Sequence, residues 1–169
     1  MRLLAAINIS EVGLYWPRTE NEVNYMRIIA AAALVVTSIV PTMAANVDVQ
    51  MLNKGDAGTM VFEPPLVRIA PGDTVTFLPT DKGHNAESIK EMTPEGGDLF
   101  KGRIGKEVVA NFTVPGVYGI KCAPHLGMGM IAVVVVGDDV RNLEAVKAVK
   151  MPKKAQERFE PLFAAIEAQ

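Results

Sequence analysis

Soft metal-binding side chains are concentrated in residues 121–130. This stretch holds the only cysteine, Cys122, and His125, which is one of only two histidines. The other histidine, His84, lies upstream, and Met128 and Met130 follow His125. Thiolate, imidazole and thioether ligands favour a soft or borderline metal, and copper fits this set better than magnesium or calcium. The residues therefore predict a His₂Cys copper site with Met128 or Met130 as a weak axial ligand, an arrangement typical of blue-copper electron transfer.

Each of these residues alone has an ordinary explanation, because a single cysteine or methionine is usually part of a core. Zinc would accept the cysteine and histidines, but a thioether suits it poorly. A cysteine hydrolase would need a histidine-activated Cys122 and an oxyanion motif, and no such motif is visible. A copper chaperone or storage protein remains the alternative, although it would favour exposed Met- and Cys-rich loops. With both histidines assigned to one copper, no second histidine-based catalytic metal is expected, and we predict that the protein is not an enzyme.

Further stretches resemble the cupredoxins, and among these the pseudoazurin family. They are Met51-Leu52-Asn53-Lys54-Gly55, Met60-Val61-Phe62-Glu63-Pro64, Pro71-Gly72-Asp73-Thr74-Val75-Thr76-Phe77, Asp81-Lys82-Gly83-His84-Asn85 and Met128-Gly129-Met130-Ile131. The resemblance covers about Ala45 to the C-terminus. It implies an all-β Greek-key sandwich of about eight strands with a C-terminal helical extension, and one type 1 copper that cycles between Cu(I) and Cu(II). It also implies the ligands His84, Cys122, His125 and Met130, with Met128 as a surface neighbour.

The residue pattern independently favours a sandwich of short strands. Residues 47–51 alternate apolar and polar side chains, as a half-buried strand does. A turn is expected at 53–56, and Pro64-Pro65 and 71–73 separate further short strands. Residues 117–122 form the strand that leads to Cys122, and the apolar run 131–136 predicts a strand buried on both faces. No clear pattern covers 87–105.

The C-terminal residues change to helical spacing. Apolar residues recur at Val140, Leu143, Val146 and Val149 and again from Ala155 onward, which predicts two helices packed on the same domain. Asp138 or Asp139 is expected to cap the first helix. Pro161 is expected to kink or split the second. The predicted domain thus comprises a sandwich over 45–138 and helices over 139–169.

The N-terminus predicts export. Residues 26–44 have a basic start, an apolar run and a small-residue cleavage signature, which together are typical of a secretory signal peptide cut before Ala45. The apolar run is shorter than the ~20 residues of a transmembrane anchor, the alternative reading. Residues 1–25 are polar where a signal should begin, so we interpret them as an upstream start chosen too early. The protein is then expected to be a soluble periplasmic monomer.

Length and composition set the remaining limits. The chain has 169 residues, which suits one domain. A net charge of -2 argues against a basic nucleic-acid-binding surface, and one cysteine excludes an intrachain disulfide. The resemblance implies a redox partner, copper nitrite reductase or a c-type cytochrome, that docks on an apolar face around His125. Lysines near this face in the sequence predict a rim that steers an acidic partner, the alternative being ordinary solvated surface charges. The face comprises Met60, Pro79, Pro124, Leu126 and Met128, and the rim Lys54, Lys82 and Lys121.

Overall fold

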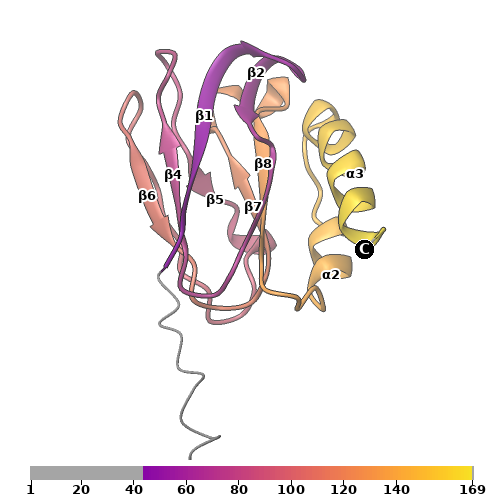
Figure 1. Cartoon of the computed structure of the whole chain (residues 1–169). Coiled ribbons are helices and arrows are strands. Elements are labelled where there is room, and N and C mark those ends of the chain that lie inside the picture. Colours follow the sequence, from indigo (N-terminus) through magenta and orange to yellow (C-terminus); the bar gives the residue numbers. More distant parts are fainter. Residues whose placement is uncertain (1–43, 169) are drawn as a thin grey trace, which may run out of the picture. The chain divides into compact units, whose positions relative to one another are not determined.

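Eight strands form two four-stranded sheets in the computed structural model, which describes residues 44–168 (Figure 1). The predictions for residues 1–25 and for the signal peptide over 26–44 concern residues that, apart from Ala44, lie outside this described part of the chain. One sheet has the order β2-β1-β4-β6, with β1 Asn46–Gly55, β2 Gly58–Glu63, β4 Thr74–Leu78 and β6 Val108–Asn111. The other has the order β3-β8-β7-β5, with β3 Leu66–Ile69, β5 Glu87–Ser88, β7 Gly116–Lys121 and β8 Ile131–Val136.

The chain crosses between the sheets at Pro64-Pro65, between β2 and β3. Two strand pairs are parallel, β1 with β4 and β3 with β8, and the other pairs are antiparallel. Parallel neighbours that are not consecutive in sequence require crossover connections, and here these run from one sheet to the other. The predicted two-layer sandwich is confirmed.

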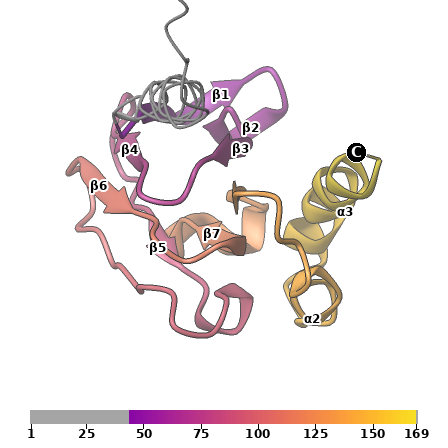
Figure 2. The ribbon, with the colours of Figure 1, turned by 60° about the horizontal axis from the view of Figure 1, so that its bottom comes forward.

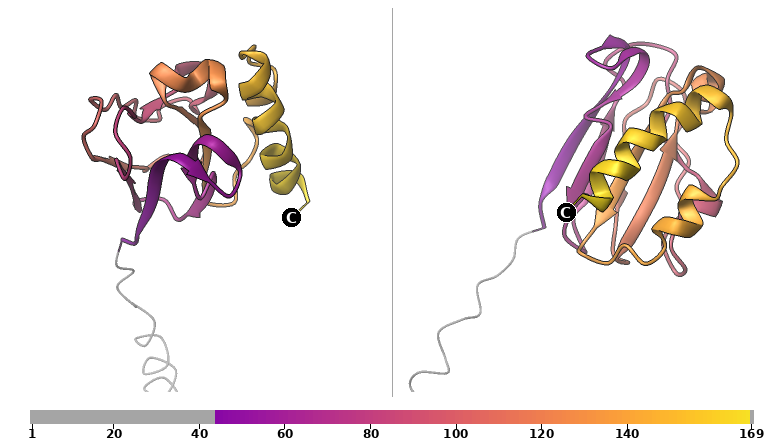
Figure 3. Two further views of the ribbon diagram at one scale, coloured as in Figure 1. Left: turned by 90° about the horizontal axis from the view of Figure 1, so that it is seen from above. Right: turned by 90° about the vertical axis from the view of Figure 1, so that its right-hand side faces the viewer.

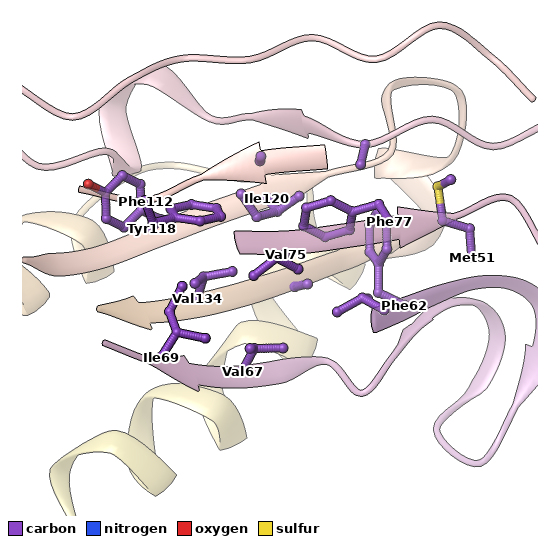
Figure 4. Packing of buried hydrophobic residues seen from close by; sticks show 14 of the residues in the cluster. Met51, Phe62, Val67, Ile69, Val75, Phe77, Phe112, Tyr118, Ile120 and Val134 are labelled. Atoms are coloured by element: carbon purple, nitrogen blue, oxygen red, sulfur yellow. The ribbon is translucent and has the colours of Figure 1, made fainter. Parts of the chain in front are cut away.

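The space between the sheets is filled by a buried apolar core (Figure 4). Phe62 packs edge-to-face on Phe77, and Phe112 packs edge-to-face on Tyr118. The buried Tyr118 hydroxyl donates to the carbonyl of Val114 at 2.7 Å, which satisfies its polar group. Cys122 and Met130 belong to the same core cluster, so two of the predicted copper ligands are fixed within the buried core.

A second apolar cluster joins the outer face of β8 to two helices, α2 Leu143–Lys147 and α3 Lys153–Glu167. Both helices lie on the same side of the sandwich (Figures 2 and 3). Alternate residues of β8 point to opposite faces, so Val134 enters the inter-sheet core while Val133 and Val135 face the helices. This double burial explains the continuous apolar run at 131–136.

Two local predictions are wrong, and a third is wrong in part. The first turn is not at 53–56, because β1 continues to Gly55, which pairs with Gly58 of β2. The turn therefore consists of Asp56 and Ala57. Neither Asp138 nor Asp139 caps α2. Its N-cap is Asn142, and the Asp139 carboxylate is bound by the main chain and guanidinium of Arg141 instead.

Pro161 does not split the second helix, since α3 is one helix of 15 residues with Pro161 inside it. Pro161 and Glu157 are both exposed, and both line a hollow between α3 and the first strands. The proline ring leaves the Glu157 carbonyl without its helical partner, which costs less on an exposed part of the helix that water can reach.

Candidate metal centre

The loop between β7 and β8 is closed at its base by main-chain hydrogen bonds. Cys122 directly follows β7, a 3₁₀ helix, η2, spans Ala123–Met128, and Met130 directly precedes β8. The Cys122 N–H donates to the Met130 carbonyl at 3.0 Å, and the Met130 N–H donates to the His125 carbonyl at 3.2 Å. Gly129 turns the chain with φ of 85°, which glycine adopts at little cost. Three candidate ligands are thus fixed on one short, doubly anchored loop.

His84 approaches this loop from the connection between β4 and β5. It follows Gly83, which has φ of 92°, and its side chain is fully buried. The His84 Nε2 lies 3.1 Å from the Asn53 Oδ1. Because an amide oxygen only accepts hydrogen bonds, Nε2 carries the proton and Nδ1 keeps a free lone pair. Asn53 therefore sets the tautomer in which His84 presents Nδ1 as a ligand.

The donor atoms of His84, Cys122 and His125 converge on one point. The two Nδ1 atoms are 3.0 Å apart, and the Cys122 Sγ lies 3.8 Å from His84 Nδ1 and 3.5 Å from His125 Nδ1. Metal–nitrogen and metal–sulfur bonds of about 2.0 and 2.3 Å require separations of roughly 3 to 4 Å between ligands that share an ion. The three donors therefore fit a single metal, and their softness matches copper.

Asn85 joins the His84 segment to the Cys122 loop. Its main-chain N–H points at the Cys122 Sγ at 3.5 Å, and its Oδ1 accepts the Ala123 N–H at 2.8 Å. Its Nδ2 donates to the Gly102 carbonyl at 3.2 Å and lies 3.4 Å from the Glu87 carboxylate. Asn85 thus holds the sulfur and its neighbouring main chain in register with His84.

Burial controls the protonation of the metal-free donors. It raises the pKa of the Cys122 thiol above its ordinary value, while the hydrogen bonds from the Asn85 and His125 main chains act in the opposite direction. Burial also lowers the pKa of His84, and the neighbouring His125 lowers it further. Without metal the site therefore favours a neutral thiol and a neutral His84, so copper uptake must displace the Cys122 proton.

The two methionine candidates differ in their surroundings. Met130 is 0% exposed and lies in the core cluster with Cys122, whereas Met128 is 43% exposed. Sequence reasoning did not identify Asn53 and the full role of Asn85. Asparagines next to turns are common, so neither carries a specific signal apart from the position of Asn85 beside His84.

Comparison with known proteins defines the class. Residues 49–137 match the copper-binding proteins of the plastocyanin/azurin family. A pseudoazurin of Methylorubrum extorquens is 53% identical over 145 residues, which cover 85% of this chain and 98% of that protein. A pseudoazurin of Paracoccus pantotrophus is 53% identical over 131 residues, which cover 78% of this chain and 90% of that protein.

Solved structures agree with the sequence comparisons. The crystal structure of pseudoazurin from Methylobacterium extorquens AM1 has a TM-score of 0.70 at 58% identity and covers 72% of this chain and 98% of its own. Native pseudoazurin from Hyphomicrobium denitrificans has a TM-score of 0.68 at 49% identity and covers 71% of this chain and 97% of its own.

The fold and the donor set therefore define a cupredoxin that binds one type 1 copper. Within that class the chain belongs to the pseudoazurin family of blue-copper electron-transfer proteins. In residues 44–168, no helix combines the length and apolarity needed to cross a membrane.

Proposed function

We propose that this protein carries single electrons in the periplasm on a copper ion held by His84, Cys122, His125 and Met130. The observation that carries the ligand assignment is the convergence of two imidazole Nδ1 atoms and one thiol sulfur within 4.8 Å of one another. Met130 completes the set because it is buried beside Cys122, at the other anchored end of the loop.

Bound copper supplies a one-electron couple between Cu(I) and Cu(II). The chain's own contribution is to keep the donors in place when the charge changes. Main-chain bonds close the loop from Cys122 to Met130, and Asn53 and Asn85 fix His84 and the sulfur from outside. Asn53 lies in β1, and the loop is anchored where β7 ends and β8 begins. The donors therefore move little between the two charge states, which favours rapid electron exchange.

The burial of the ligands favours a carrier over the alternative, a copper chaperone or storage protein. Cys122, His84 and Met130 are each 0% exposed. A protein that hands over the metal itself needs ligands that a partner can reach. An electron needs only a short path to the surface, and the partly exposed His125 provides one. We likewise propose that the protein is a carrier and not an enzyme.

We propose copper nitrite reductase or a c-type cytochrome as the redox partner, docking on the face formed by Met60, Pro79, Pro124, Leu126 and Met128. The carbonyls of Met60 and Gly129 bind the same guanidinium, which supports the placement of Met60 beside η2. In the proposed rim, Lys54 and Lys82 are exposed, and Lys121 is half-buried with its ammonium 3.3 Å from Glu87.

Export and domain organisation are further parts of the proposal. The signal-like segment over 26–44 supports cleavage before Ala45 and release into the periplasm. We propose that the released protein is a monomer. The mature protein would then comprise the sandwich over 45–138 and the helices over 139–169, with 1–25 not translated. N-terminal sequencing of the periplasmic protein tests the cleavage site, and the mass of the uncleaved precursor tests where translation starts.

A visible absorption spectrum of the copper-loaded protein tests the proposed function. A Cu(II)–thiolate site should give an intense charge-transfer band at about 600 nm. Cys122→Ser should abolish this band, because a hydroxyl cannot replace the soft anionic sulfur. A full visible band in Cys122→Ser would refute the proposed ligand set.

A further inference from the structure

One side chain connects helix α3 to two segments beside the copper site. The Arg158 Nη1 donates to the carbonyl of Met60 at 2.8 Å and to the carbonyl of Gly129 at 3.0 Å. Its Nη2 donates to the carbonyl of Thr59 at 2.9 Å. A planar guanidinium with a fixed fork of donors can hold several carbonyls at defined angles, which a flexible ammonium cannot do.

Two of these three carbonyls belong to residues in the left-handed backbone region. Met60 has φ of 52° and is the only non-glycine residue with positive φ in residues 44–168. Such a conformation costs on the order of 1 kcal/mol or more and persists only where surrounding contacts hold it. Gly129 has φ of 85°. Met60 therefore needs external support, and Arg158 binds its carbonyl as well as that of Gly129.

The helix also lies directly against Gly129. A Cβ at that position would be 2.9 Å from the Arg158 Cδ and 2.9 Å from the carbonyl oxygen of Lys154, so only glycine fits. The guanidinium and the first turns of α3 thus form one wall of the loop that carries the ligands. Figure 3 shows α3 running alongside this end of the sandwich.

Gly129 and Met60 are each linked to a proposed ligand, Gly129 directly and Met60 through Asn53. Gly129 directly precedes Met130, whose N–H binds the His125 carbonyl. Met60 lies opposite Asn53 in the β1–β2 register, between the pairs Leu52–Val61 and Lys54–Thr59. The side chain of Asn53 holds His84. Arg158 is therefore linked to the proposed ligand Met130 through the loop and to the proposed ligand His84 through the hairpin.

We propose that Arg158 is a positioning residue for the copper site, which couples helix α3 to the loop at Gly129–Met130 and to the hairpin at Met60. This inference rests on the proposed ligand set. The competing explanation is that Arg158 only fastens α3 to the sandwich. These two roles make different predictions for the site, because fastening alone changes stability without changing the ligand geometry.

The chain offers a matched control. Arg68 on β3 also ties the sandwich to α3, through a bond from its Nη2 to the Ala165 carbonyl at 3.2 Å. Ala165 lies in the last turns of α3, whereas Arg158 lies in its first half. Arg68→Gln therefore removes a guanidinium tie to the same helix without touching the loop or the hairpin.

The test compares Arg158→Gln, Arg158→Lys and Arg68→Gln with the unmodified protein. For the copper-loaded protein the measurements are the visible spectrum and the reduction potential. For the copper-free protein the measurement is amide hydrogen exchange at Met130. Arg158→Gln should shift both copper properties and speed Met130 exchange by about tenfold, as the loop opens locally. Arg158→Lys should give intermediate values, and Arg68→Gln should leave all three unchanged.

Two results would overturn the proposal. One is an Arg158→Gln protein with unchanged spectrum, potential and exchange. The other is an equal effect of Arg68→Gln. If Arg158→Gln does not fold, Arg158→Lys decides, since it keeps the charge and loses the fork. Failure of the proposed function would look different: the unmodified protein would lack the visible band, while the exchange measurement on copper-free protein would still report on Arg158.

Discussion

At the residue scale, two asparagines orient the proposed ligands. Asn53 accepts from His84, and Asn85 donates its main-chain N–H toward Cys122. A short amide side chain offers both a donor and an acceptor, so it can satisfy several buried groups from one position. This explains how a fully buried imidazole and thiol are oriented without a charged neighbour in direct contact with either donor atom.

Burial supports the proposal that Met130, and not Met128, is the axial ligand. Met130→Gln should keep copper bound but lower the reduction potential, because an oxygen donor stabilises Cu(II) relative to Cu(I). Met128→Gln is the control and should leave the potential unchanged, since Met128 is 43% exposed. Voltammetry of both variants decides the question. A lowered potential in Met128→Gln alone would show that the axial ligand has been assigned to the wrong methionine.

The copper-free protein should lose stability on both sides of neutral pH. Burial raises the folded-state pKa of Cys122. The contribution of the neutral thiol to the free energy of unfolding is therefore full below the ordinary thiol pKa of about 8.5 and is lost as the pH rises. Burial lowers the folded-state pKa of His84, so its contribution is full above the ordinary imidazole value of about 6.5 and is lost as the pH falls. Urea midpoints measured from about pH 5.5 to 9.5 should therefore decline at both ends.

Single substitutions separate these two contributions. Cys122→Ser should flatten the alkaline decline only, and His84→Gln should flatten the acid decline only. The range stops below the ordinary tyrosine value because burial also raises the pKa of Tyr118. Unchanged profiles in both variants would mean that neither burial effect controls stability.

At the element scale, sequence reasoning succeeded where signals were local. The spacing of Cys122, His125 and Met130 predicts one loop, and the apolar run 131–136 predicts a doubly buried strand; the structure has both. It failed where tertiary contacts decide. Strand β5 has only two residues, too few to show a period, and exists because it pairs with β7. The contacts of Arg158 join residues 98 and 29 positions apart, which no periodicity reveals.

The cap of α2 shows the same limit. Asp139 has the right residue type for a cap and directly precedes Val140, the first residue of the apolar helical pattern. The adjacent Arg141 nevertheless binds its carboxylate and lowers its pKa to about 2. Asn142 then lies at the helix start and uses its side chain to bind the main chain of Val117 at the beginning of β7. The helix start is therefore set by contact with the sheet.

Pro161 should limit the stability of α3. A proline inside a helix removes one hydrogen bond and costs about 3 kcal/mol, although it also restricts the unfolded chain. Pro161→Ala should therefore stabilise the protein by about 1–2 kcal/mol in urea unfolding and leave the copper spectrum unchanged. Glu160→Ala, an exposed neighbour, is the control and should change stability by less than about 0.5 kcal/mol.

The opposite result for Pro161→Ala would also be informative. Pro161 lines a small hollow of about 230 Å³ between α3 and the first strands, together with Leu162 and Val61. Destabilisation by the alanine would show that contact of the proline ring with this hollow outweighs the missing hydrogen bond.

At the scale of the whole molecule, charge is unevenly distributed around the proposed docking face. The protein has a net charge of -2, yet Lys54 and Lys82 are exposed near the segments that approach the copper loop. The Glu87 carboxylate lies 3.3 Å from the Lys121 ammonium and 3.9 Å from the Lys101 ammonium, so it partly offsets the positive charge of both lysines. A lysine rim on a slightly acidic protein can steer an acidic partner toward one face.

This charge arrangement predicts how association depends on salt. Screening acts over about 10 Å at 0.1 M ionic strength, so electron transfer with an acidic redox partner should slow as salt is added. Replacing Lys82 and Lys121 by Gln should lower the association rate at low salt and flatten its salt dependence. The visible spectrum should not change, because neither lysine is a proposed ligand. Stopped-flow mixing at several ionic strengths measures both quantities.

A second double variant separates local steering from net charge. Lys147 is the last residue of α2, and Lys150 follows three residues later. The N-cap of this helix, Asn142, binds Val117 at the start of β7, whereas the copper loop follows the end of β7. Replacing both by Gln removes the same charge at the opposite end of the sandwich, so the association rate should stay near that of the unmodified protein. Equal slowing in the two double variants would show that the partner responds to net charge. An unchanged rate and salt slope for the Lys82 and Lys121 variant would exclude the rim as the docking surface.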